Sequence, residues 1–416
     1  MNRPEWTADP AAGTGAALLL RLFLPFGLGY FLSYLFRMVN AVIAPALLQD
    51  ISMTPGQIGL VSGAYLLCFA AFQLPLGLLL DRYEPRRVLA VLLLVAAAGA
   101  GLFAQAQDVM QLLLGRGLIG LGVSACLMAA FKTYSHWFSV QRLPLINGLQ
   151  LTAGGLGGLA ATRPVELVVD LYDWRFLFWG LAVCCVLVSL LVFWLVPRHA
   201  VEPHGESLGQ QLQGTWSIMT DPRFYTRAPA SMLAQSAFAA IQGLWLGLWL
   251  RDVEGLSTAA LSQQLLLVAL GMSLGFLSLG WLAERLQHQG FTPGQICAGG
   301  MTVFLLLQLL IFSGPGLTPD WLWCALGFFG TSGTLMFAVL SQLFPRHKTG
   351  RVNTSLNLMI FLGAFLMQWG IGLIAGLWGE VEHLPIEAYQ AAFGFCALLQ
   401  LMGLLWFLRG RALMAR

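Results

Sequence analysis

The sequence predicts an all-α polytopic membrane protein, with twelve transmembrane helices arranged as two six-helix repeats. Of its 416 residues, 58% are hydrophobic and only 10% are Asp, Glu, Lys or Arg, whereas soluble domains carry about 25% charged residues. The apolar residues form long continuous runs, and short motifs of the first half recur in the second. This composition excludes an ordinary soluble enzyme, a disordered regulator and a nucleic-acid-binding protein.

Twelve apolar runs approach the length of about 20 residues that a helix needs to cross the hydrocarbon core of a membrane. In chain order the expected spans are residues 22–46, 57–80, 87–106, 109–133, 145–169, 175–196, 228–250, 261–283, 294–313, 321–343, 354–378 and 389–409. The pentapeptide TPGQI occurs at 54–58 and again at 292–296. Each copy predicts a helix start, with Thr as the N-cap, Pro in the first turn and Gln completing a capping box.

The positions of the Lys and Arg residues predict the orientation of the chain. With the N-terminus inside, sixteen of the 22 fall in cytoplasmic segments, four fall within spans, and only Arg175 and Arg251 fall outside. We therefore expect a protein of the inner or plasma membrane with both termini in the cytoplasm. Its expected parts are a tail (1–21), a six-helix half (22–196), a linker (197–227), a second half (228–409) and a tail (410–416).

The two halves share a motif at an equivalent turn. Segment 74–82 reads LPLGLLLDR and segment 277–285 reads LSLGWLAER, with a constant offset of 203 residues. The offset aligns Gly77 with Gly280, Asp81 with Glu284, and Arg82 with Arg285. This repetition indicates duplication of a six-helix unit.

The segment GLLLDRYEPRR, which follows the second span, resembles the loop motif of the major facilitator superfamily. The matching residues are Gly77, Asp81, Arg82, Arg86 and Arg87. The segment departs from the motif at Glu84, where the family usually has Gly. Arg116 with Gly120 resembles the family's signature in the fourth span. The resemblance implies a transporter of that superfamily and says almost nothing about its substrate.

The loop motif indicates a conformational role. Gly77 allows two helices to approach closely, and Asp81 can pair with Arg82 or with a neighbouring helix end and so latch one state. The alternative is that the arginines only set the topology. The residues expected to act in gating or conformational change are Gly77, Asp81, Arg82, Arg86, Arg87, Arg116, Arg163, Glu284 and Arg285.

Basic residues within spans are candidates for substrate contact, because a charge in lipid is costly and usually faces a cavity. Arg37 shares a helical face with Tyr34 and Asn40, which predicts a polar cavity lining. Its structural alternative is an arginine satisfied by helix-end carbonyls. Lys132 either lines the cavity or reaches to the membrane interface. Arg163, one turn before Glu166, suits a gate or a local salt bridge better than substrate contact.

The distribution of acidic residues favours an anionic substrate. None of the 19 Asp and Glu residues lies in the middle of an expected span. The second half contributes amides and indoles instead of charges, and we expect Trp249 to belong to the interfacial aromatic belt. The residues expected to bind the substrate are Arg37, Tyr34, Asn40, Lys132, Gln235, Gln242, Trp245 and Gln368.

These observations predict a secondary transporter for a small organic or inorganic anion, working by alternating access with its site near the midplane. A co-transported proton and an exchanged anion are both open as coupling modes. The alternative function is export of drugs or other lipophilic compounds. The seven cysteines lack metal-ligand spacing and no nucleotide-binding motif occurs. We therefore expect no enzyme activity and no metal or cofactor. We also expect the protein to be a monomer, with its substrate and the lipid bilayer as its partners.

Overall fold

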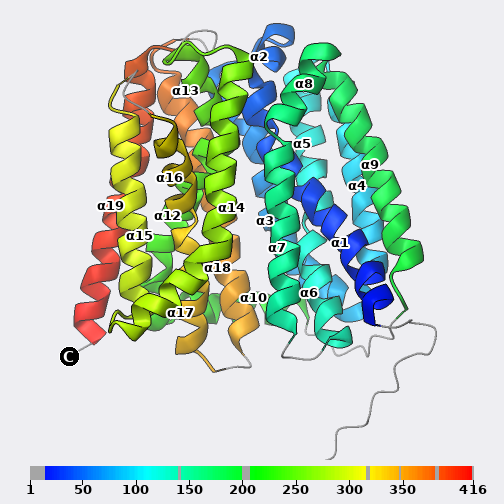
Figure 1. Ribbon diagram of the computed structural model, residues 1–416, viewed down its shortest axis with the longest axis vertical. Coiled ribbons are helices and arrows are strands. Elements are labelled where there is room, and N and C mark those ends of the chain that lie inside the picture. The colour runs from blue at the N-terminus through cyan, green and yellow to red at the C-terminus, as the bar shows by residue number, and fades with distance from the viewer. Residues whose placement is uncertain are drawn as a thin grey trace, which may run out of the picture.

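The computed structural model describes residues 15–138, 142–198, 207–314, 319–345, 348–379 and 384–414, which are almost entirely helical. Parts of the expected tails and linker, namely residues 1–14, 199–206 and 415–416, lie outside this description. The helices form two groups that stand side by side, one built by the first half of the chain and one by the second (Figure 1).

The helices of the first group run alternately up and down the molecule. They are α1 (Gly15–Met38), α2 (Asn40–Asp50), α3 (Pro55–Arg82), α4 (Pro85–Ala104), α5 (Val109–Val123), α6 (Cys126–Trp137), α7 (Leu143–Ala160), α8 (Arg163–Leu171) and α9 (Trp174–Leu195). A connecting segment follows, with α10 (Leu208–Met219) and α11 (Pro222–Tyr225).

The second group begins with a helix that changes its winding. Its elements are α12 (Ala228–Ala240), the π-helical turn η2 (Ile241–Trp245), α13 (Leu246–Asp252), α14 (Thr258–His288), α15 (Pro293–Ile311), α16 (Asp320–Gly330), the 3₁₀ turn η3 (Ser332–Thr334), α17 (Leu335–Leu343), α18 (Thr349–Ala375) and α19 (Ile386–Met414). We call the end of the molecule that carries α6, α10 and α17 the linker side, and the end that carries α2, α8 and α13 the distal side (Figure 1).

The predicted spans are largely confirmed. Ten helical segments of the described chain are long and apolar enough to cross a membrane, and α1 with α2 makes an eleventh that bends by 51°. The expected span 145–169 is instead broken into α7 and α8. Pro164, in the first turn of α8, accounts for the break, because proline cannot donate a helical hydrogen bond and clashes with the preceding turn.

The two TPGQI starts are confirmed as capping boxes. Thr54 accepts a hydrogen bond from the Gln57 amide nitrogen (3.2 Å), and the Gln57 side chain accepts one from the Thr54 nitrogen (2.8 Å). Thr292 and Gln295 repeat the arrangement at the start of α15. These caps fix where α3 and α15 begin.

The two groups are joined most closely along α3 and α18, which run antiparallel across the distal half of the molecule. An added Cβ at Gly372 would lie 2.2 Å from the Pro55 carbonyl oxygen, and one at Gly59 would lie 2.7 Å from the Gln368 carbonyl oxygen. Further along, the rings of Phe69 and Phe361 stack with centroids 4.3 Å apart. We call this contact the α3–α18 seam; it depends on glycine because only a residue without Cβ permits these backbone distances.

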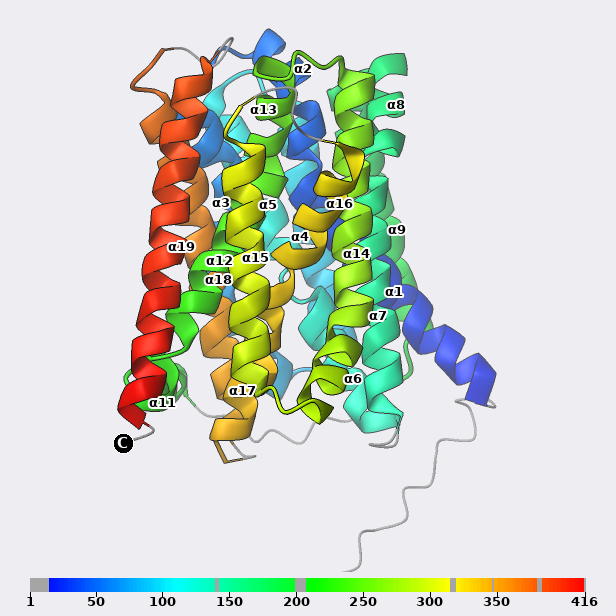
Figure 2. The same ribbon diagram turned by 60° about the vertical axis from the view of Figure 1, so that its left-hand side comes forward.

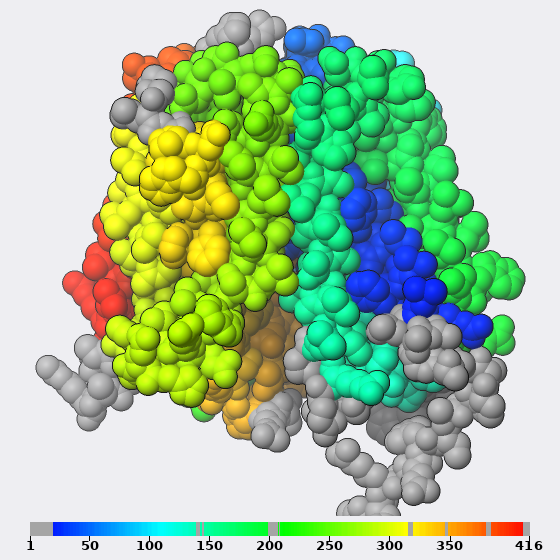
Figure 3. All heavy atoms as spheres, viewed as in Figure 1, coloured from blue at the N-terminus to red at the C-terminus, as the bar shows by residue number. Residues whose placement is uncertain are grey.

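A second contact between the groups joins α7 to α14. Figure 3 shows these helices touching over their upper lengths and a recess between their lower ends, through which α18 is visible. Away from the contact between the groups, α19 lies beside α15 in the second group, and α1 projects obliquely from the first group (Figure 2). On this face the groups are packed together at the distal side and have a recess between them at the linker side, while α10 contacts both α3 and α18.

The seam gives a direct prediction for Gly372. Gly372→Ala places a methyl group against the Pro55 backbone, which cannot give way as a flexible side chain can. We expect the mutation to cost ~1–3 kcal/mol, as overpacking does. Gly370→Ala on the same helix is the matched control, because an added Cβ there meets nothing within 4 Å. Thermal unfolding in detergent tests this, and equal melting temperatures for the two variants would contradict the seam as described.

Candidate functional site

Arg37 lies where the α3–α18 seam ends, at mid-height in the molecule. Its guanidinium carbon is 4.5 Å from the ring centroid of Tyr34, 4.8 Å from that of Phe361 and 5.5 Å from that of Phe69. The cation thus contacts aromatic rings from both groups of helices. Its side chain is partly exposed, and the α3–α18 seam closes the interface on its distal side.

Among the described residues, no carboxylate neutralises Arg37. None of the ion pairs in the described part of the chain includes it, and its Nε atom is buried without a hydrogen-bond partner. The polar groups around it are the phenols of Tyr30, Tyr34 and Tyr65. Tyr65 is itself fixed by donating to the Ser33 carbonyl oxygen (2.9 Å). The site therefore combines one uncompensated cation with neutral donors.

A chain of hydrogen bonds crosses the seam beside Arg37. Asn40 Nδ2 donates to Ser62 Oγ (2.8 Å), and Gln368 Nε2 donates to the same oxygen (2.6 Å). Trp245 Nε1 donates to the Gln368 carbonyl oxygen (2.9 Å). All four side chains are buried. Ser62, which the sequence did not single out, is the hub that joins the first group to the second.

The helix that carries Trp245 approaches both the Arg37 backbone and Gln368. The turn η2 is π-helical, and such turns are frequent at functional sites. Gly243 lies within this turn, and a Cβ added to it would meet the Arg37 carbonyl oxygen at 3.6 Å and the Gln368 amide at 3.9 Å. Gln242, also expected at the site, is buried in the same turn.

Arg116 supports the bend between α1 and α2. It is 1% exposed and donates from Nη1 to the Phe36 carbonyl oxygen (2.9 Å), close to where α1 ends. Its guanidinium carbon lies 5.4 Å from the centroid of the Tyr65 ring, and an added Cβ at Gly120 would lie 2.2 Å from the Tyr65 carbonyl oxygen. Arg116 thus holds α5 against the two helices that present Arg37 and Tyr65.

Two residues expected to bind the substrate lie elsewhere. Lys132 Nζ donates to Asp81 Oδ1 and to the Leu80 carbonyl oxygen, both at 2.6 Å, at the linker-side end of α3. It is therefore satisfied by a carboxylate and a helix-end carbonyl and does not join Arg37. Gln235, in the amide orientation that satisfies its neighbours, bridges the Gly330 oxygen and the Thr334 nitrogen at 3.0 Å each. It stabilises the break between α16 and α17.

Trp249 also departs from expectation. It is fully buried and packs edge-to-face against Phe312 and Tyr389, so it is not part of an interfacial belt. A tryptophan near the end of a span is compatible with both an interfacial position and a buried one, so the sequence could not decide between them.

The loop motif packs the first group and touches the linker. Arg86 pairs with Glu84 (2.9 Å) and donates to the Phe193 carbonyl oxygen at the end of α9 (3.0 Å). Glu84 also pairs with Arg87 (3.1 Å), so the residue that replaces the family's Gly organises both arginines. Gly77 faces the side chain of Gln211 in α10.

The remaining residues expected in gating are more exposed. Arg82 is exposed beside Asp81 at the end of α3. In the repeat of the motif, Glu284 is exposed and the Arg285 guanidinium lies 5.3 Å from the Trp281 ring centroid. Arg163 pairs with Glu166 at 2.6 Å, which is the local salt bridge expected from their spacing.

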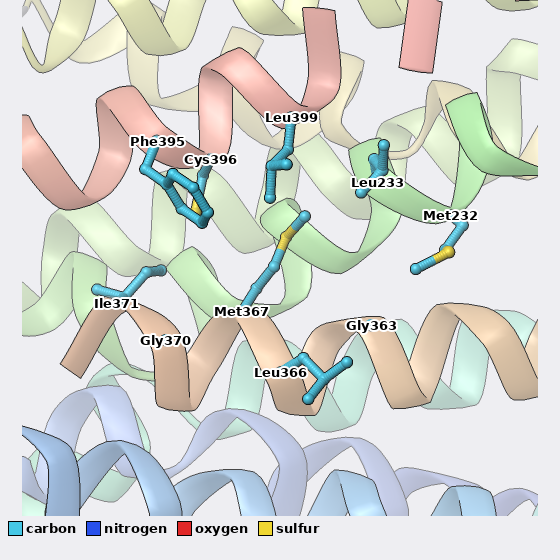
Figure 4. Close-up of a pocket in the computed structure, with 10 residues that line it drawn as sticks. All are labelled: Met232, Leu233, Gly363, Leu366, Met367, Gly370, Ile371, Phe395, Cys396 and Leu399. Carbon is cyan, nitrogen blue, oxygen red and sulfur yellow. The ribbon is translucent and has the colours of Figure 1, made fainter. Parts of the chain in front are cut away.

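An apolar groove of about 200 Å³ lies between α12, α18 and α19, apart from Arg37. In Figure 4, Phe395, Cys396 and Leu399 of α19 lie opposite Met367 and Ile371 of α18. No charged side chain lines it, so it lacks the groups that would hold an anion.

The family model of the Major Facilitator Superfamily matches residues 26–367. The chain belongs to this superfamily. A probable sulfoacetate transporter, SauU, of Cupriavidus necator is 30% identical over 185 residues, which cover 44% of this chain and 43% of that protein. The Hexuronate transporter of Escherichia coli K12 is 24% identical over 392 residues, covering 88% of this chain and 89% of that protein.

The fold is similar to that of solved members of the superfamily. A bacterial homolog of the human lysosomal transporter Spinster, in an inward-facing and occupied conformation, superposes with a TM-score of 0.72 at 16% identity, covering 94% of this chain and 96% of that one. The chain is thus an integral, multi-pass membrane protein with the fold of this superfamily.

Ser62 provides a test of the hydrogen-bond chain. Ser62→Ala leaves the amides of Asn40 and Gln368 without their shared acceptor, and we expect it to destabilise the protein by ~1–3 kcal/mol. Ser355→Ala is the control, because Ser355 is equally buried but its hydroxyl has no partner among the described residues. Thermal unfolding of both variants is the measurement. If Ser355→Ala melts as early as Ser62→Ala, the hub role is refuted.

The Asp81–Lys132 pair is testable as a conformational contact. Both side chains are roughly 40% exposed, at 42% and 36%, so Asp81→Asn should cost less than ~1 kcal/mol of stability. We nevertheless expect its transport rate to fall several-fold, because Asp81 lies where the helix ends must rearrange. Lys132→Met should lower the transport rate to a similar extent. The transport rate of the double variant should be no lower than that of either single variant. A wild-type transport rate in Asp81→Asn would show that the Asp81–Lys132 pair has no role in the conformational change.

Proposed function

We propose that this protein is a secondary transporter that moves a small organic anion across the membrane by alternating access. The observation that supports this best is Arg37, a partly exposed guanidinium at the junction of the two helix groups that has no carboxylate partner in the described part of the chain. A charge placed in the membrane without a counter-ion is costly, so it is retained where it has a function. An anionic substrate supplies the missing counter-charge.

The proposed binding site centres on Arg37. A guanidinium holds a carboxylate or sulfonate through two parallel hydrogen bonds. Tyr34 contacts the same guanidinium and can add a phenol donor. We assign Gln242, which is buried in η2 of the second group, to the same lining. Asn40, Trp245 and Gln368 are engaged in the hydrogen-bond chain, so we assign them to the gate beside the anion.

We propose that the linker side is cytoplasmic and the membrane an inner or plasma membrane. The excess of Lys and Arg in the loops of that side supports this orientation. With the α3–α18 seam closed and the recess at the linker side, the protein is then inward-facing. Transport requires the recess to close and the seam to open, with the monomer as the working unit.

The names of the relatives agree with an acidic substrate. Sulfoacetate carries a sulfonate and a carboxylate, and hexuronates are sugar carboxylates. We propose substrates of this class, with the charged end at Arg37.

Export of lipophilic compounds is the second candidate function. The aromatic rings of Phe69 and Phe361 beside Arg37 favour it, since such rings also line sites for hydrophobic ligands. A thermal-shift panel of sulfoacetate, glucuronate and galacturonate against lipophilic cations separates the two functions. Binding to the native state stabilises it in proportion to the logarithm of ligand concentration over Kd. Shifts with the cations alone would favour export.

Arg37 variants test the site itself. Some of the acids in this panel should stabilise the wild type. For these acids, Arg37→Ala should make the binding free energy less favourable by ~2–5 kcal/mol, as for other truncated charge pairs. This corresponds to ~30-fold or more in affinity. Arg37→Lys should recover only a small part, because an ammonium cannot form the bidentate contact. Arg198→Ala, which removes an exposed arginine, is the control. Binding is measured by calorimetry alongside a melting curve, and a folded Arg37→Ala variant with wild-type affinity would refute the site.

A further inference from the structure

We propose that the protein is an obligatory anion exchanger: it crosses between its two states only when an anion occupies Arg37, so every inward movement of one anion is coupled to the outward movement of another. This inference rests on the proposed function and specifies how the same site is coupled. It follows from the charges inside the membrane and from the absence of a titratable carboxylate beside them.

Two cations lie at mid-height without an acidic partner. Arg116 is buried and bonded to a carbonyl oxygen, and Arg37 contacts only rings and phenols. Tyr65 lies between them: its ring faces Arg116, and its hydroxyl belongs to the surroundings of Arg37. The interior therefore carries a positive charge that no described group of the protein cancels.

None of the carboxylates that form ion pairs among the described residues pairs with Arg37. Asp81 pairs with Lys132 and Glu84 with Arg86 at the linker side. At the distal side, Glu166 pairs with Arg163 and Asp252 with Arg251. These are ends of spans, so within the described chain no acidic side chain beside Arg37 can take up a proton and neutralise the site in the return step. The titratable groups that face Arg37 are the phenols of Tyr30, Tyr34 and Tyr65.

The cost of the cation depends on the state of the protein. In the present state Arg37 is partly exposed, and solvation of the exposed part lowers the cost of the charge. To change state, the recess must close before the seam opens, and Arg37 is then enclosed on both sides. An enclosed charge without a partner is strongly unfavourable, whereas an ion pair in good geometry offsets most of that cost. The loaded protein therefore crosses, and the empty protein remains where it released its substrate.

Transport into anion-free medium is the first test. Proteoliposomes are loaded with radiolabelled glucuronate or sulfoacetate and diluted into buffer with or without the same unlabelled acid outside. We expect efflux to be at least tenfold faster with the external acid, and to be unchanged by a protonophore. Equal efflux with and without external acid would overturn obligatory exchange while leaving anion transport intact. If neither acid moves nor shifts the melting temperature, it is the proposed substrate class that fails.

A second test needs no substrate. Ala41 lies in the distal contact between the groups, where its carbonyl oxygen meets Gly247, and it is 2% exposed. Ala41→Cys, in a protein whose native cysteines are replaced by alanine, reports opening of the distal side to an impermeant thiol reagent. In Tris chloride buffer, which contains neither a carboxylate nor a sulfonate, we expect slow labelling, and labelling at least tenfold faster when Arg37→Gln removes the cation.

The control for the labelling test is Arg198→Gln, which removes an exposed positive charge and should leave the rate unchanged. If Arg37→Gln labels no faster than the parent protein, the charge of Arg37 does not restrain the empty protein. The exchange proposal is then wrong, whichever acid proves to be the substrate.

Discussion

The constraint on which the structure depends is the placement of one uncompensated cation, Arg37, at mid-height in a membrane protein. The protein tolerates it by surrounding the guanidinium with aromatic faces and phenols and by leaving part of the side chain exposed. The neighbouring elements surround this position: Arg116 holds the α1–α2 bend, and Gly243 of the π-helical turn lies near both the Arg37 carbonyl and the Gln368 amide. A carboxylate partner would remove the cost and, with it, the affinity for an external anion.

The seam beside Arg37 has the properties that a reversible closure requires. Glycines bring α3 and α18 to backbone contact at the distal end of the seam. Ser62 then adds a few directed hydrogen bonds that can be made and broken as a unit. Because Phe361 belongs to α18 and also contacts Arg37, opening of the seam changes the surroundings of the cation directly. Binding at the site and closure of the gate thus share residues, which is the physical basis for coupling them.

The sequence predicted those features that depend on local pattern. Apolar run length identified the spans, the TPGQI caps identified two helix starts, and spacing placed Arg37 with Tyr34 and Asn40 on one face. What it missed depends on contacts between distant segments. Periodicity gave the face on which Lys132 lies but not that Asp81, 51 residues away, would neutralise it. Ser62 gave no signal, because a lone serine in a span is common. Pro164 was a usable sign of the broken fifth span.

The central claim is that Arg37 is the ligand of the transported anion, and a structure of the protein with bound acid tests it most directly. The acid that gives the largest thermal shift is added before structure determination. The account predicts carboxylate or sulfonate oxygens at hydrogen-bond distance, about 2.7–2.9 Å, from the guanidinium nitrogens of Arg37. An acid bound elsewhere, with the Arg37 guanidinium capped by backbone carbonyls, would contradict it.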